Sequence, residues 1–186
     1  MPAFTKSRGL LALSLLGALL ASSPSYTQTE GAVAQVLKRG PSGLPLPRFV
    51  SLKSGRVNMR VGPGTQYAVE WLYLKPGLPV EIIQEYDNWR RVRDMDGAEG
   101  WINQALLSGQ RTGIVAPWLK GKGKAALPLM AEPNEGARAV AQLEPGVIGE
   151  VTVCNGDWCR MTFAGHEGWI RQDSLWGVYP GEAVQD

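Results

Sequence analysis

The strongest constraint on the fold of this chain is a stretch that occurs twice. Residues 89–102 read WRRVRDMDGAEGWI, and residues 158–170 read WCRMTFAGHEGWI, which is shorter by one residue. Each copy begins with Trp, continues as an alternating run, passes through a Gly-containing turn and ends in Gly-Trp-Ile. Two short alternating runs around a Gly turn are typical of a β-hairpin, so the recurrence indicates a duplicated β domain.

Five pairs of matching positions, two of them within this stretch, show that the repeat extends beyond it. They keep their order at separations of 70, 69, 69, 68 and 68 residues, and they are Pro63 with Pro133, Gly77 with Gly146, Trp89 with Trp158, Trp101 with Trp169, and Leu107 with Leu175. We therefore predict two domains, at residues 49–109 and 112–179, followed by a tail at 180–186.

The pattern within each predicted domain favours short strands. Residues 56–61 alternate as RVNMRV, and the chain holds 23 Gly and 13 Pro, which favour turns. The glycine before each repeated Trp-Ile is expected to let the backbone approach its neighbour. We predict an all-β fold made of two tandem small β-barrels of about five short strands each.

The N-terminus has the composition of an export signal. Lys6 and Arg8 precede an apolar run at residues 9–21, which is too short to span a membrane. We predict a signal peptide and cleavage region at 1–34, with Ala34 fitting the small-residue rule, then a flexible leader at 35–48. The mature protein is expected to be periplasmic or secreted, with no membrane span after removal of the signal.

Charge and residue counts exclude several classes of partner. The net charge of +2 is too small to indicate a nucleic-acid-binding protein. One His and two Cys do not make a metal site, and we expect no metal and no cofactor.

The two cysteines, Cys154 and Cys159, are expected to form a disulfide in an oxidising compartment. The repeat offset of 69 places them on Glu85 and Arg90, on either side of the same hairpin turn. The first domain is therefore expected to hold an opposite-charge pair where the second holds the disulfide.

The segment from Arg56 to Ile83 resembles the opening of a bacterial SH3 domain. The hallmark of that family, N-x-R-x-G-P, corresponds to Asn58, Arg60, Gly62 and Pro63, and the later Trp and Gly-Trp positions also fit. The second domain is divergent, because it keeps Pro133 but lacks the Arg and the Gly before it. The resemblance implies a non-catalytic module that binds cell-wall peptide or glycan, or partner proteins.

The predicted ligand-binding residues lie in the first domain and are Asn58, Arg60, Tyr67, Trp71 and Tyr73. Trp71 and Tyr73 share one face of a predicted strand at residues 69–74, and this apolar surface is either a binding patch or a contact between domains. The repeated tryptophans, Trp89, Trp101, Trp158 and Trp169, are predicted to form the structural framework. For Trp101 and Trp169 a position in the core is preferred over contact with a ligand.

These features favour a non-catalytic exported module that binds peptidoglycan or another cell-envelope component. The alternative is an interaction or scaffolding module for an envelope enzyme, without wall affinity of its own. An enzyme is not expected. Glycoside hydrolysis needs a pair of carboxylates, and the candidates besides Glu85 are Asp94, Asp96 and Glu99, which lie on or beside a predicted turn, where acidic residues shape the turn.

Overall fold

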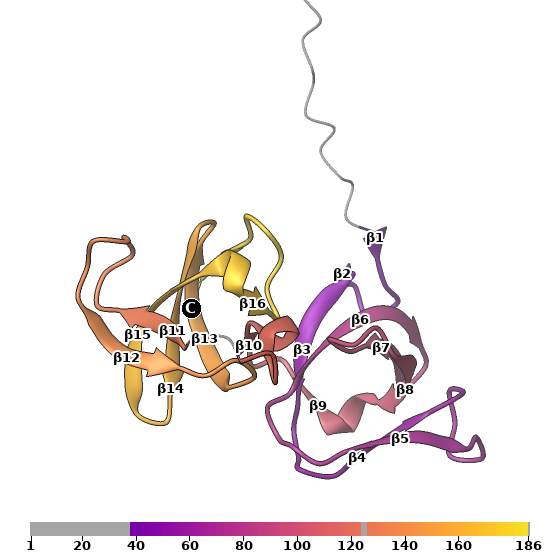
Figure 1. Ribbon diagram of the computed structural model, residues 1–186. Helices are drawn as coiled ribbons and strands as arrows, with labels where there is room; N and C mark the ends of the chain where they lie inside the picture. Colours follow the sequence, from indigo (N-terminus) through magenta and orange to yellow (C-terminus); the bar gives the residue numbers. More distant parts are fainter. Residues whose placement is uncertain (1–37, 124–125, 186) are drawn as a thin grey trace, which may run out of the picture. The chain divides into compact units, whose positions relative to one another are not determined.

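The computed structural model describes residues 38–123 and 126–185 (Figure 1). The predicted signal peptide at 1–34 and the first residues of the predicted leader lie outside this part. The described chain is all-β, with three short 3-10 turns, as predicted. In this part of the chain no helix has the length and apolar character needed to cross a membrane.

Two large antiparallel sheets and one two-stranded sheet form the described part of the chain, and each large sheet curls around its own core (Figure 1). In spatial order, the first sheet contains β5 (Val69–Tyr73), β4 (Val57–Arg60), β8 (Glu99–Asn103), β7 (Trp89–Arg93), β6 (Pro79–Tyr86), β3 (Arg48–Leu52) and β9 (Leu107–Ser108). The second sheet contains, in its corresponding order, β12 (Ala139–Leu143), β11 (Leu127–Met130), β15 (His166–Arg171), β14 (Trp158–Phe163), β13 (Ile148–Asn155), β10 (Thr112–Val115) and β16 (Leu175–Trp176).

The two strand orders are the same, so the repeat in the sequence is a repeat of topology. Each sheet holds more strands than the five predicted. The prediction had no strand at β3 or at the two-residue last strand, β9 or β16, whereas β10 overlaps residues 114–119, which the sequence indicates as an extra strand or the first strand of the second domain. The last strand follows a 3-10 turn, η1 (Gln104–Leu106) in the first domain and η3 (Gln172–Ser174) in the second, while η2 (Pro117–Leu119) follows β10.

In the repeated Gly-Trp-Ile stretch, the isoleucine and not the tryptophan belongs to the core of each domain. Ile102 and Ile170 have exposed fractions of 0% and 2%, whereas Trp101 and Trp169 are half-buried. Successive residues of a strand point to opposite faces, so each tryptophan lies on the outer face of its sheet. The predicted core position of these two tryptophans is therefore wrong.

The glycine before each Trp-Ile pair has the predicted role of allowing a close approach of strands. A Cβ added at Gly100 would lie 2.9 Å from the Arg60 carbonyl oxygen, and one added at Gly168 would lie 2.7 Å from the Met130 carbonyl oxygen. Real Cβ atoms do not approach backbone oxygen this closely, so both domains require glycine at this point.

The predicted disulfide is confirmed, and so is its counterpart in the first domain. Cys154 and Cys159 are bonded and face each other between β13 and β14. Glu85 and Arg90 face each other in the same way between β6 and β7, with 3.3 Å between the Arg90 Nε and a Glu85 carboxylate oxygen. The two domains thus link the same pair of positions by different chemistry.

Residues 38–48 of the predicted flexible leader are ordered. β1 (Lys38–Arg39) pairs with β2 (Pro45–Leu46), and β3 begins at Arg48. In the turn between β1 and β2, the backbone N–H and the hydroxyl of Ser42 donate to the Glu85 carboxylate at 2.9 and 2.8 Å. These contacts tie residues 38–48 to the first domain, which corrects the prediction for this segment.

The predicted tail also belongs to the fold. β17 (Ala183–Val184) pairs with β13, and the Glu182 carboxylate lies 2.9 Å from the Arg111 guanidinium. The segment after residue 179 therefore adds a strand to the second sheet.

Candidate functional site

A groove lies on the outer face of the first sheet, where β4, β8 and β7 are neighbours. It encloses about 310 Å³ and is lined by Asn58 and Arg60 of β4, Thr65 of the β4–β5 loop, Trp89 of β7, Asn103 of β8, and Ala105 and Leu106 of η1. The structure thus brings two predicted ligand-binding residues, Asn58 and Arg60, together with Trp89, which was assigned to the framework.

Arg60 shapes the loop that closes one end of this groove. Its Nη1 donates to the Tyr67 carbonyl oxygen at 2.6 Å. The Tyr67 ring lies against Gly62, where an added Cβ would be 2.5 Å from the ring. Because both contacts hold the β4–β5 loop that carries Thr65, they give the Arg and the Gly of the hallmark a local structural role.

The second domain has a groove at the equivalent place. Its hollow of about 160 Å³ is lined by Leu127, Pro128, Met130, Glu135, Trp158, Ile170, Arg171 and Ser174. Strand register aligns Pro128 with Asn58 and Met130 with Arg60, since these residues pair with matching positions of β12 and β5. Trp158 corresponds to Trp89, because Trp158 pairs with Arg171 as Trp89 pairs with Asn103.

The two grooves differ in how their tryptophan is covered. In the second domain the Arg171 guanidinium carbon lies 5.6 Å from the centre of the Trp158 ring, and Trp158 has an exposed fraction of 8%. A guanidinium over an aromatic face is a favourable contact. In the first domain Asn103 replaces this arginine and Trp89 is half-buried. The first groove is therefore open and polar, while the second is smaller, more apolar and covered.

Tyr73 is not available to a ligand. Its exposed fraction is 6%, and its hydroxyl donates to Asp94 at 2.9 Å. Burial, together with the nearby Asp94 carboxylate, raises the pKa of this hydroxyl. Tyr73 pairs with the buried Val57, so its side chain points into the core, and the prediction for this residue is wrong.

Trp71 and Tyr67 are exposed but do not line the groove. Trp71 lies on β5, the strand at the end of the first sheet. The structure thus divides the five predicted ligand-binding residues between the groove, the β4–β5 hairpin and the core.

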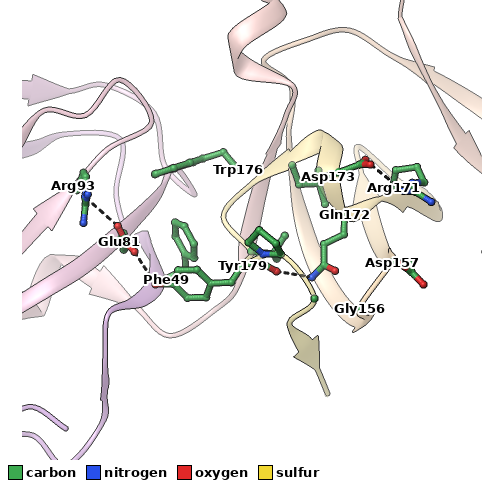
Figure 2. Close-up of a pocket in the computed structure, with 14 residues that line it drawn as sticks. Phe49, Glu81, Arg93, Gly156, Asp157, Arg171, Gln172, Asp173, Trp176 and Tyr179 are labelled. Atoms are coloured by element: carbon green, nitrogen blue, oxygen red, sulfur yellow. Dashed lines mark hydrogen bonds and ion pairs between the residues drawn. The ribbon is translucent and has the colours of Figure 1, made fainter. Parts of the chain in front are cut away.

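A further pocket is lined by residues of both domains (Figure 2). It encloses about 560 Å³, and Phe49 of β3 meets Tyr179 and Trp176 there with ring centres 4.7 and 5.2 Å apart. The Tyr179 hydroxyl donates to Glu81 at 2.9 Å. Because these aromatic rings pack on one another, we assign them to the contact between the domains.

Sequence reasoning missed Thr65 and Asn103 in the groove and the aromatic contact around Phe49. Asn103 could have been found from the repeat, because it directly follows the repeated Gly-Trp-Ile and differs there from Arg171 of the second domain. Phe49, Trp176 and Tyr179 lie at the edges of the repeats, where no repeated pattern marks them.

The bacterial SH3 domain family matches residues 53–109 and 123–177. The chain belongs to this family. The two matched regions fall within the two sheets, so the chain contains two tandem bacterial SH3 domains, the second divergent at the groove.

Comparison with solved structures gives weaker likenesses. NlpC2 and NlpC1 from Trichomonas vaginalis are 14% and 15% identical over 70% and 78% of this chain and 48% and 50% of theirs, each with a TM-score of 0.31. An NlpC/P60 family protein from Bacillus cereus is 11% identical over 69% of this chain and 55% of its own, with a TM-score of 0.30. The chain spans about half the length of these proteins, and TM-scores this low carry no argument about function. No curated protein matches the chain.

Proposed function

We propose that this protein is a non-catalytic binding module that acts outside the cytoplasm and binds peptidoglycan, or another envelope component, through the groove of its first SH3 domain. One observation carries this proposal. Both domains have a groove beside the same tryptophan, and only in the first is that tryptophan half-exposed and accompanied in the groove by Asn58, Arg60 and Asn103. An aromatic face with amide and guanidinium groups suits sugars and extended peptides.

The disulfide supports a location outside the cytoplasm. Disulfides such as Cys154–Cys159 form and persist in oxidising compartments and are rare in the cytosol. The family resemblance implies the same location.

The contacts of the acidic residues support a non-catalytic role. The Glu85 carboxylate lies 2.7 Å from the Arg48 guanidinium and also meets Ser42 and Arg90. Burial acts to raise the pKa of Glu85, but hydrogen bonds from Ser42 and Arg48 outweigh it and lower the pKa to about 2. A carboxylate that stays ionised is a poor general acid near neutral pH.

The Asp94 side chain stabilises a turn. One of its carboxylate oxygens accepts from the backbone N–H groups of Asp96 and Ala98 at 3.0 and 2.9 Å. This carboxylate therefore shapes the β7–β8 turn, in line with the turn chemistry expected from the sequence.

Co-sedimentation with purified sacculi tests the proposal. The wild-type protein is expected to sediment with sacculi, and Asn58→Ala and Asn103→Ala should each weaken binding by about tenfold, the effect of one or two lost hydrogen bonds. Gln142→Ala is the matched control, because Gln142 is an exposed amide on β12 outside both grooves. Wild-type protein left wholly in the supernatant would defeat wall binding, and unchanged binding of both groove variants would place the site elsewhere.

The second candidate function is a scaffold for a partner protein, without wall affinity. The exposed side chains of β5 favour it, because they lie outside the groove and form a surface of different chemistry.

A further inference from the structure

Exposed apolar side chains gather on one hairpin of the first SH3 domain. Among the described residues, eight large hydrophobic side chains are exposed, and five of them lie between residues 61 and 74 with exposed fractions of 41–66%. These five are Val61, Tyr67, Val69, Trp71 and Leu74. Single exposed hydrophobic residues are common, but a contiguous group marks an interaction surface.

This hairpin also presents an open sheet edge. β5 pairs only with β4 among the described strands and ends the first sheet. The N–H and C=O groups of alternate residues therefore point away from the sheet. Proteins usually protect such edges with charged residues, proline or short strands, and β5 carries only one charge, Glu70, in its five residues.

The second domain shows that the fold does not require this apolar edge. β12 ends the second sheet in the same register, with Ala139 and Ala141 where β5 has Val69 and Trp71. Before the Pro-Gly turn that follows, the second domain has Glu144 and the first has Lys75. In the first domain this edge thus carries large apolar side chains and a basic residue at its end. In the second domain it carries small side chains and an acidic residue at its end.

Basic residues gather at the C-terminal end of β5. Lys53 and Arg56 precede β4, and Lys75 follows β5, and all three are exposed. The two loops lie side by side, because a Cβ added at Gly55 would be 3.7 Å from the Leu74 carbonyl oxygen. Residues 53–80 contain four basic residues and a single acidic one, Glu70.

We infer that the β5 edge binds an extended segment of a partner protein, which adds to the first sheet as a strand. The backbone of that segment would pair with the free groups of β5, and its alternate apolar side chains would cover Val69 and Trp71. Acidic residues at one end of the segment would meet Arg56 and Lys75. Charge disfavours self-pairing, because two hairpins that each carry an excess of basic residues repel each other.

Selection from a phage-displayed library of random twelve-residue peptides tests this inference on the full protein. The enriched peptides are expected to alternate apolar residues and to carry Asp or Glu at one end. Binding of a selected peptide, measured by fluorescence anisotropy, should weaken about tenfold or more in Trp71→Ala, as expected for loss of a central aromatic contact. It should also weaken in Lys75→Glu, which copies the second domain.

Trp118→Ala is the matched control, because Trp118 is an exposed tryptophan in η2 of the second domain. It should leave peptide affinity unchanged. Strand addition should also slow hydrogen exchange at β5 amides when the peptide binds, a change that contact through side chains alone would not produce. Val69→Ala is a second edge variant, and far-UV circular dichroism shows whether each variant is folded.

Several results would overturn the inference. Selected peptides that bind Trp71→Ala as tightly as wild type, or that leave exchange at β5 unchanged, would exclude strand addition. A dimer seen by analytical ultracentrifugation and abolished by Trp71→Ala would assign the edge to a second copy. Adsorption to vesicles with phosphatidylglycerol that depends on Trp71 would assign it to a lipid surface. Sacculus binding by Trp71→Ala should equal that of wild type, which separates this surface from the groove.

Discussion

Glu85 and Cys154 occupy the same position in two copies of one domain and are held by different means. Cys154 is bonded to the residue that faces it, whereas Glu85 is held by Arg90, Arg48 and Ser42. A disulfide does not depend on protonation, but a buried ionised carboxylate does. A loss of stability in acid is therefore expected from the position of Glu85 and not from the position of Cys154.

Stability should fall in acid because of Glu85. Its pKa of about 2 in the folded protein is below the ordinary value of 4.5, so its contribution is fully present above pH 4.5 and is lost as the pH falls toward 2. Urea unfolding between pH 2 and 6 should show this loss in the wild type. Glu85→Gln should be less stable near pH 6, and its difference from the wild type should shrink with falling pH.

Glu144→Gln is the control for this experiment, because Glu144 is exposed in the loop after β12. The free energy of unfolding of Glu144→Gln should vary with pH as that of the wild type does. Parallel pH curves for wild type and Glu85→Gln would mean that other groups cause the loss of stability in acid.

At the scale of single elements, the β7–β8 hairpin shows what can be predicted from the sequence. Alternation and the Gly turn located both strands, and the repeat located the same hairpin in the second domain. The pattern did not decide which of two adjacent apolar residues, Trp101 or Ile102, faces the core. That choice depends on the neighbouring strand β4, whose backbone approaches Gly100 on the inner side.

Substitutions in β8 distinguish the two residues. Ile102→Ala should cost about 2–5 kcal/mol of unfolding free energy, because it opens a cavity in a filled core. Trp101→Ala should cost clearly less, since the ring is half-buried on the outer face. Urea denaturation of both variants measures the difference, and a larger cost for Trp101→Ala would contradict the assignment of the faces.

The candidate site could be predicted only in part, again because the sequence does not show which strands are neighbours in the sheet. Asn58 and Arg60 belong to a local motif that the sequence displays, so the family resemblance was enough to find them. Trp89 and Asn103 join them only because β8 lies between β4 and β7 in the sheet. Strand order of this kind is set by tertiary pairing and is not written in any single segment.

At the scale of the whole molecule, contacts between the domains extend over several elements. Besides the aromatic group around Phe49, the Thr112 hydroxyl donates to the Gly77 carbonyl oxygen at 2.7 Å. The Arg111 guanidinium carbon lies 6.0 Å from the centre of the Phe49 ring. These contacts couple the stability of one domain to that of the other.

The two domains should therefore unfold together. Differential scanning calorimetry of the wild type is expected to show one transition, since interface packing links two small cores. The Phe49→Ala, Tyr179→Phe double variant removes the ring contacts of Phe49 and the hydrogen bond to Glu81, and should separate the transition into two. Two transitions in the wild type would show that the contact is too weak to couple the domains.

The place of β3 has a practical consequence for producing the first domain alone. The family match begins at residue 53, after β3, yet Val50 and Leu52 of β3 belong to the core and Arg48 binds Glu85. A fragment cut at residue 53 would lose the strand that lies between β6 and β9, which would give β6 an open edge and leave β9 without its partner strand. Open edges beside an incomplete core promote aggregation. Expression of the first domain should therefore begin at residue 38 or earlier, so that β3 and Ser42 are both retained.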